Sequence, residues 1–135
     1  MEAIIDTNIL IYETIEDSMY HKEVVEKLKD LESLYIPTNI LIEFILVMKK
    51  LKLENEVIMY KISEILEDPS ISLISIAKMD FKESLKIIIR ENRDMKEIND
   101  KIILALAKRK NLPIYTYDRQ LKQQARKYGV KVLSR

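Results

Sequence analysis

Four acidic residues that lie far apart in the sequence could together bind a metal ion. Asp6 and Asp118 each directly follow a short run of strand-forming residues, and Glu43 is the only charged residue in the otherwise largely apolar stretch 39–48. Asp100 stands just before another apolar segment. Carboxylates are hard oxygen ligands of the kind that Mg²⁺ and Mn²⁺ prefer. If these four side chains converge, the sequence predicts a site for a divalent cation of this type.

Each of the four acids also has a structural explanation. Asp6 and Asp118 could cap the helices that follow them, and Asp100 would be favoured in the first turn of a helix by the helix dipole. Glu43 could form a salt bridge with a lysine of another helix or reach water. An unpaired, ionised carboxylate on a buried helix face would be costly, so Glu43 is the acid that most strongly indicates a cation.

The composition excludes several other kinds of chemistry. The chain has no cysteine and a single histidine, His21, so cysteine-based zinc sites and histidine-rich metal sites are excluded. Gly129 is the only glycine, so neither a phosphate-binding P-loop nor a dinucleotide-binding glycine turn can form. Any catalysis must therefore rely on carboxylates.

Short apolar segments alternate with amphipathic ones along the chain. The expected strands are 3–5, 34–36, 70–76, one beginning at 113–115, and 130–133. The expected helices are 19–31, one from a cap at Thr38 or Asn39 to about residue 51, 54–67, 78–90, 99–110 and 119–128, with Gly129 ending the last one at the C′ position. This alternation predicts an α/β fold: a three-layer sandwich with a parallel sheet of four or five short strands, forming a single domain over residues 1–135.

The predicted fold would bring the acids together, because in parallel sheets ligands bind at the carboxyl ends of the strands. In the order and spacing of these acids, the chain resembles the PIN-domain nucleases, most closely the small single-domain prokaryotic type that includes the VapC toxins. The resemblance extends over almost the whole chain. It rests on Ile4-Ile5-Asp6-Thr7-Asn8-Ile9-Leu10-Ile11, Thr38-Asn39-Ile40-Leu41-Ile42-Glu43, Asn99-Asp100-Lys101-Ile102-Ile103-Leu104-Ala105-Leu106-Ala107, Ile114-Tyr115-Thr116-Tyr117-Asp118 and Gly129-Val130-Lys131-Val132-Leu133.

The resemblance implies which residues would form the active site. Asp6, Glu43, Asp100 and Asp118 match the acidic quartet of the family, which binds Mg²⁺ or Mn²⁺ and hydrolyses RNA. Asp6 and Asp118 are the expected direct metal ligands, Asp100 a direct or water-mediated one, and Glu43 would orient water or complete the shell. Thr7, Asn8 and Thr116 match the polar residues that orient the quartet. The chain departs from the family at Lys101, where a small residue is usual, and at Arg119 and Gln120, where many members add an acid.

The function implied is that of a metal-dependent endoribonuclease whose products carry 5′-phosphate and 3′-hydroxyl ends, acting as the toxin of a VapBC-type toxin–antitoxin pair. A PIN-domain nuclease of RNA maturation, or an inactive PIN-like module that binds RNA or protein, are the alternatives. A phosphoryl-transfer receiver would need an acceptor aspartate at the end of the third strand, and residues 73–76 contain none. A haloacid-dehalogenase-like enzyme would need an aspartate two residues after Asp6, where Asn8 stands.

The charge distribution favours a polyanionic partner. Residues 108–135 hold nine bases and one acid, whereas residues 1–107 hold fourteen bases and twenty-one acids. Arg119, Lys122 and Arg126 would lie on one face of the helix after Asp118, so we expect them to bind RNA, although the same charges could simply be solvated. We also expect a homodimer, because the apolar residues of two helices are hard to bury within one small domain: Ile58, Ile62, Ile65 and Leu66 on one, and Ile87, Ile88 and Ile89 on the other. A small antitoxin as a second partner, no membrane association and a cytoplasmic location are also expected.

Overall fold

The computed structural model describes residues 1–133 and contains a four-stranded, all-parallel sheet in the order β3-β2-β1-β4. The strands are β1 (Glu2–Ile5), β2 (Ser33–Pro37), β3 (Ile71–Ile74) and β4 (Ile114–Tyr115). The helices are α1 (Thr7–Thr14), α2 (His21–Lys29), α3 (Thr38–Lys50), α4 (Asn55–Glu67), α5 (Lys78–Arg90), α6 (Ile98–Lys110) and α7 (Arg119–Lys127), with a short 3₁₀ turn η1 (Met95–Glu97) before α6. The predicted class, an α/β sandwich with a parallel sheet, is confirmed.

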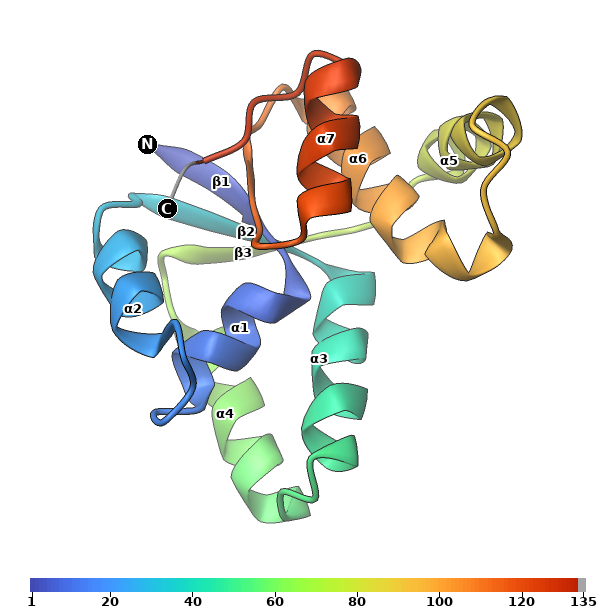
Figure 1. The fold of residues 1–135 in the computed structure, drawn as a ribbon. Helices are drawn as coiled ribbons and strands as arrows, with labels where there is room; N and C mark the ends of the chain where they lie inside the picture. Colours follow the sequence, from blue (N-terminus) through green and yellow to red (C-terminus); the bar gives the residue numbers. More distant parts are fainter. Residues whose placement is uncertain (134–135) are drawn as a thin grey trace.

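The sheet lies between two layers of helices. Helices α6 and α7 lie on one side of it, and α1 to α4 lie on the other, as Figure 1 shows. Strand β1 is central, and its residues Ala3, Ile4 and Ile5 are fully buried. This double coverage explains why β1 is continuously apolar rather than alternating.

Most predicted elements are present, with ends that differ from the predicted ones by at most two residues. The exception among the strands is the last one: in residues 130–133 only Val132 pairs with the sheet, through a single parallel bridge to Ile114. The apolar residues in this segment cover the edge of β4 without forming a ladder. Gly129 has a φ of +75° directly after α7, the left-handed conformation expected of a C′ glycine.

Two helix starts differ from the predictions. Helix α1 is not among the elements predicted by range, although the sequence indicated that Asp6 could cap a helix. Helix α3 begins directly after Pro37, and neither Thr38 nor Asn39 acts as a side-chain cap there. Proline fixes the extended backbone that precedes the helix, so α3 can begin without a capping side chain.

Helices α5 and α6 are joined by a paired charge as well as by apolar contacts. The guanidinium of Arg109 donates to both oxygens of Asp80, at 2.7 and 2.8 Å. The apolar side chains of α6 from Ile102 to Ala107 are buried, which anchors this helix against the sheet. Among residues 1–133, no helix has the length and apolar character needed to cross a bilayer.

Candidate active site

Asp6 lies where β1 ends and α1 begins. Its Oδ1 accepts a hydrogen bond from the backbone N–H of Thr7 at 2.8 Å, and its Oδ2 accepts from the hydroxyl of Thr116 at 2.6 Å. The amide of Asn8 donates to Oδ2 at 3.3 Å. The Asp6 side chain is therefore buried and oriented by three donors, and it also caps α1.

A small polar network connects the ends of β1 and β4. The hydroxyl of Thr116 accepts from Asn8 Nδ2 at 3.2 Å and from the backbone N–H of Asp118 at 3.0 Å. Asn8 Oδ1 in turn accepts from the backbone N–H of Tyr117 at 3.2 Å. Thr116 thus links the two acids. The third residue expected to orient the site, Thr7, contacts Asp6 through its backbone, while its buried hydroxyl has no hydrogen-bond partner among the described residues.

Asp118 stands at the end of the β4 segment and caps α7. Its Oδ1 accepts from the backbone N–H groups of Gln120 and Leu121, at 2.9 and 3.2 Å. The capping explanation considered from the sequence is therefore correct for both Asp6 and Asp118. It does not remove these residues from the site, because β1 and β4 are adjacent parallel strands whose carboxyl ends meet.

Glu43 and Asp100 come from helices on either side of the sheet. Glu43 lies in the second turn of α3, and its Oε2 accepts from the side-chain amide of Asn99 at 3.1 Å. Asn99 Oδ1 accepts from the amide of Asn39 at 3.2 Å. Asp100 follows Asn99 in the first turn of α6. Glu43 is met by an amide rather than by a lysine, so the salt-bridge alternative is not what the structure contains.

Lys101 departs from the family pattern, but it forms an ion pair outside the acidic quartet. Its side chain is 1% exposed, and its Nζ donates to Glu97 at 2.8 Å. Arg93 donates to both oxygens of Glu97, at 3.0 and 3.1 Å. Glu97 therefore faces two cations, and these contacts lower its pKa to about 2.

The four acids interact electrostatically. Burial raises the pKa of Asp6 to about 6, and repulsion from Glu43 and Asp118 contributes, against the hydrogen bonds from Thr116 and Thr7 that favour the ionised form. Burial also raises the pKa of Asp100 to about 7, with repulsion from Asp6, Asp118 and Glu43 opposed by Lys101. The quartet is thus a set of mutually repelling carboxylates, which a cation would stabilise.

The chemistry of the donor groups suits a divalent cation, although the side chains do not form a complete coordination shell as they stand. Within residues 1–133, no three acidic or histidine side chains are arranged as they stand to enclose a metal ion. All the candidate donors are oxygens, and the repulsion among them is the property that cation binding would relieve. These features suit Mg²⁺ or Mn²⁺, which retain several water ligands and need few protein ligands.

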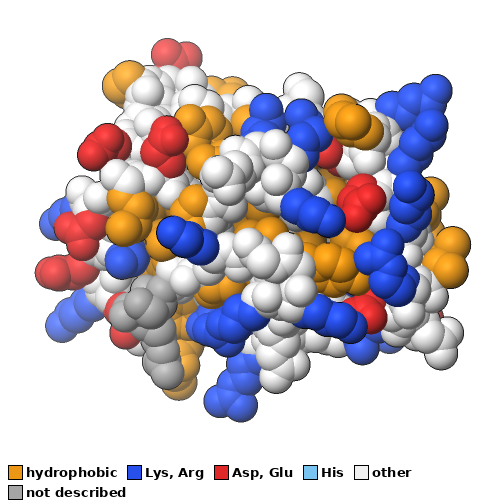
Figure 2. Space-filling view, turned by 90° about the horizontal axis from the view of Figure 1, so that it is seen from above, with side chains coloured by type: hydrophobic (Ala, Val, Ile, Leu, Met, Phe, Trp, Pro, Cys, Tyr) orange, Lys and Arg blue, Asp and Glu red, His pale blue; other side chains and the backbone are white. Residues whose placement is uncertain are grey.

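The three basic residues expected to bind RNA lie on α7, the helix that Asp118 caps. Leu121, Gln124 and Ala125 form the buried face of this helix. Arg119 and Arg126 are exposed, and the Nζ of Lys122 lies 5.7 Å from the ring centre of Tyr117. In the part of the chain described, none of the three forms a salt bridge, whereas Lys127 pairs with Glu91. Figure 2, seen from above the molecule, shows Lys and Arg side chains distributed over much of that face.

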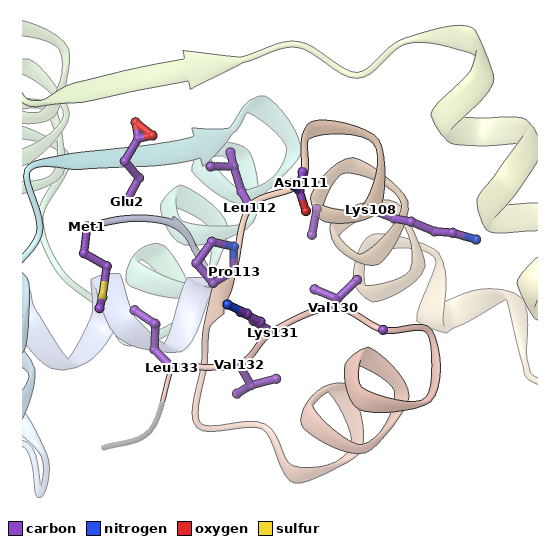
Figure 3. Close-up of a pocket in the computed structure, with 12 residues that line it drawn as sticks. Met1, Glu2, Lys108, Asn111, Leu112, Pro113, Val130, Lys131, Val132 and Leu133 are labelled. Atoms are coloured by element: carbon purple, nitrogen blue, oxygen red, sulfur yellow. The ribbon is translucent and has the colours of Figure 1, made fainter.

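A cavity of about 600 Å³ lies at the other end of β1 and β4, away from the acids. Met1, Pro113, Val130 and Leu133 are among the side chains around it, as the close-up in Figure 3 shows. Its lining is largely apolar and carries no acidic cluster, so it is not the predicted site.

Comparison with known proteins identifies the class. The PIN-domain family profile matches residues 3–127, so the chain belongs to the PIN-domain family. No sequence match is found among curated proteins.

Solved structures agree with the fold. Mycobacterium tuberculosis VapC20, described as a toxin that cleaves the sarcin–ricin loop, matches with a TM-score of 0.79 at 10% identity, over 90% of this chain and 94% of that one. The FitAcB structure from Neisseria gonorrhoeae gives 0.72 at 17% identity, with 99% and 97% covered. VapBC2 from Rickettsia felis, bound to a promoter DNA fragment, gives 0.68 at 18% identity, with 91% and 92% covered. The fold is thus similar to those of VapC and FitB proteins.

Proposed function

We propose that this protein is a metal-dependent endoribonuclease that cuts RNA phosphodiester bonds, and that it is the toxin of a VapBC-type toxin–antitoxin pair. The observation that carries the proposal is the electrostatic coupling of Asp6, Glu43, Asp100 and Asp118 at one edge of a PIN-domain sheet. Burial and the charges of the neighbouring acids raise the pKa values of Asp6 and Asp100, which is unfavourable for the stability of the metal-free protein. A reaction that depends on a bound cation would explain why the acids are placed together.

The roles of the residues follow from their positions. Asp6 and Asp118 would hold Mg²⁺ or Mn²⁺ directly, Asp100 directly or through water, and Glu43 would orient water beside them. When bound, the ion would lower the pKa of a water molecule and stabilise the negative charge that develops on the phosphate in the transition state. Asn8, Thr116 and the backbone of Thr7 would keep Asp6 in place. Products with 5′-phosphate and 3′-hydroxyl ends are expected.

The proposal of a toxin role, and of a small antitoxin as partner in the cytoplasm, draws on relatives. One similar structure is a toxin–antitoxin complex from Klebsiella pneumoniae, with a TM-score of 0.64 at 21% identity. VapBC2 from R. felis and a FitAB structure are each bound to a DNA fragment. The Lys and Arg side chains of α7 would bind the RNA backbone and so favour a nucleic-acid substrate over a protein one.

The decisive experiment compares cleavage of RNA with Mn²⁺ or with EDTA, using the wild type, Asp6→Asn and the control Asp17→Asn, which changes an exposed acid outside the quartet. Cleavage that requires Mn²⁺ and is lost only in Asp6→Asn supports the nuclease. RNA binding without cleavage in the wild type supports the inactive-module alternative.

The toxin role needs a separate test. Expression of the wild type should stop bacterial growth, Asp6→Asn should not, and co-expression of a small neighbouring gene product should restore growth. Cleavage in vitro without growth arrest would instead favour a nuclease of RNA maturation.

A further inference from the structure

We propose that Asn99 is a positioning residue that holds the Glu43 carboxylate beside Asp100, and that Asn39 fixes the orientation of the Asn99 amide. The proposal concerns how the metal site is assembled, and so it rests on the proposed function. Neither asparagine belongs to the set expected from the sequence to orient the acids.

The two asparagines connect α3 with α6 across the site. Asn99 Nδ2 donates to Glu43 Oε2 at 3.1 Å, and Asn39 Nδ2 donates to Asn99 Oδ1 at 3.2 Å. Asn39 and Glu43 are four residues apart on α3 and therefore lie on one face of that helix. Asn99, from the first turn of α6, thus contacts two successive turns of α3, and it directly precedes Asp100 in the chain.

The order of donors and acceptors determines which end of Asn99 faces Glu43. A carboxylate only accepts hydrogen bonds, so it requires the NH₂ end of the Asn99 amide. The Asn39 amide donates to the oxygen end of Asn99 and thereby holds the NH₂ end toward Glu43. Without Asn39, Asn99 could rotate and place its oxygen against the carboxylate, which would be repulsive.

The pair of asparagines carries a stability cost. Asn39 Oδ1 is buried and has no hydrogen-bond partner among the described residues. A buried acceptor without a partner loses its hydrogen bonds to water and gains none in return, which destabilises the folded state. Asn39 does not offset this by capping α3, since no side-chain cap is present there. The contribution of Asn39 is therefore to orient the Asn99 amide, and not to stabilise the fold.

Glu43 needs such an anchor because its neighbours push it away. Its charge repels those of Asp6 and Asp100. The adjacent side chains on the outer face of α3, Ile42 and Leu46, are 60% and 64% exposed, so no packed layer confines Glu43 from the solvent side. The hydrogen bond from Asn99 opposes the repulsion and keeps the carboxylate turned toward α6.

The test measures Mn²⁺ binding by calorimetry and by the metal-induced rise in melting temperature. Outer-shell partners of metal ligands typically change metal affinity or activity by about 10–100-fold. We expect Asn99→Ala to weaken Mn²⁺ binding about tenfold and Asn39→Ala to weaken it less. The control Asn55→Ala, at the exposed start of α4, should bind Mn²⁺ like the wild type.

A double-mutant cycle separates positioning from a general structural effect. If Asn99 acts through Glu43, adding Asn99→Ala to Glu43→Ala should weaken Mn²⁺ binding no further than Glu43→Ala alone. Additive losses, or wild-type affinity in Asn99→Ala, would overturn the proposal.

A crystal structure of metal-free Asn99→Ala gives a readout that needs neither metal nor RNA. Glu43 should have turned away from α6 in the variant, and an unchanged Glu43 would reject the proposal. These measurements are independent of RNA cleavage. A wild type that binds Mn²⁺ through this network but cuts no RNA would refute the proposed nuclease activity and leave the positioning role intact.

Discussion

At the scale of single residues, the carboxylates of the site have two tasks at once. Asp6 and Asp118 cap α1 and α7 through their Oδ1 atoms. The Oδ2 of Asp6 faces Thr116 and Asn8, which lie between it and the end of β4. Capping fixes the rotamer of each carboxylate, so the same hydrogen bonds that start the helices also preorganise the proposed metal ligands.

Asp6→Asn should abolish Mn²⁺-dependent RNA cleavage without unfolding the protein. The substitution removes one charge from a repelling cluster and destroys a proposed metal ligand. The folded-state pKa of about 6, against 3.8 ordinarily, corresponds to roughly 3 kcal/mol of strain at neutral pH. The melting temperature of the metal-free variant should therefore equal or exceed that of the wild type. Cleavage at the wild-type rate would refute the site assignment.

The metal-free protein should lose stability as the pH rises from about 4 to 7. The pKa values of Asp6 and Asp100 are raised to about 6 and about 7, so the native state binds protons that the unfolded state has released, and deprotonation then favours unfolding. Glu97 acts in the opposite sense, since its pKa of about 2 makes its contribution disappear as the pH falls below 4.5. Urea unfolding should thus give greatest stability near pH 4, where the loss of the Glu97 contribution on the acid side meets the loss caused by Asp6 and Asp100 on the other.

Two comparisons check the origin of that pH dependence. Saturating Mg²⁺ or Mn²⁺ should flatten it, because the ion binds the ionised acids of the native state. Asp6→Asn combined with Asp100→Asn should flatten it without metal. A double variant with the wild-type profile between pH 4 and 7 would show that other groups are responsible.

At the scale of elements, the sequence was informative where one helix or strand determines the answer. The apolar surroundings of Glu43 and the strand-end positions of Asp6 and Asp118 could be recognised because local sequence specifies local structure. The roles of Asn39 and Asn99 could not, because their hydrogen bonds join α3 to α6 across 60 and 56 residues. The segment 130–133 has the apolar pattern of a strand, yet it forms only one bridge to β4. An apolar pattern indicates which residues are buried, but it does not determine over how many residues two neighbouring strands form hydrogen bonds.

Helix α7 should determine how tightly the protein holds RNA. Replacing Arg119, Lys122 and Arg126 by Gln removes three cations from the helix that Asp118 caps, and none of the three forms a salt bridge in residues 1–133. Each phosphate contact on a single strand contributes about 0.7 to the slope of log affinity against log salt, so the slope should flatten by roughly two units. Metal affinity should remain nearly unchanged.

The matching control replaces Lys49 and Lys50, in the last turn of α3, and Lys52, just after it, by Gln, with the same change in net charge. Filter binding to one RNA at several salt concentrations compares the two triple variants. If both lose affinity equally, only net charge matters. If the α7 variant keeps the wild-type slope, the helix is merely a solvated face or serves an acidic partner.

At the scale of the whole molecule, the apolar side chains that remain exposed are not the ones on which the expected homodimer was based. The sequence suggested that Ile58, Ile62, Ile65 and Leu66, with Ile87, Ile88 and Ile89, are too many for one small core. The monomer buries most of them, and only Leu66 and Ile89 are exposed, at 54% and 80%. That basis for a dimer is therefore wrong, because α5 packs against α6 and α4 against α3, so the inner faces of both helices are buried within the monomer.

A different set of exposed apolar side chains supports a homodimer instead. Phe81, Leu85 and Ile89 recur every four residues along α5 and are 46%, 41% and 80% exposed, while Ile42 and Leu46 are exposed on α3. Stripes of this kind are unfavourable in water and typical of protein interfaces.

Light scattering at micromolar concentration should give about 32 kDa, twice the 16.0 kDa of the chain. Leu85→Glu with Ile89→Glu should shift the mass to about 16 kDa while leaving the folded monomer intact, because both side chains point away from the core. The control Leu66→Glu, on α4, should remain dimeric, and a wild type of about 16 kDa would reject the dimer.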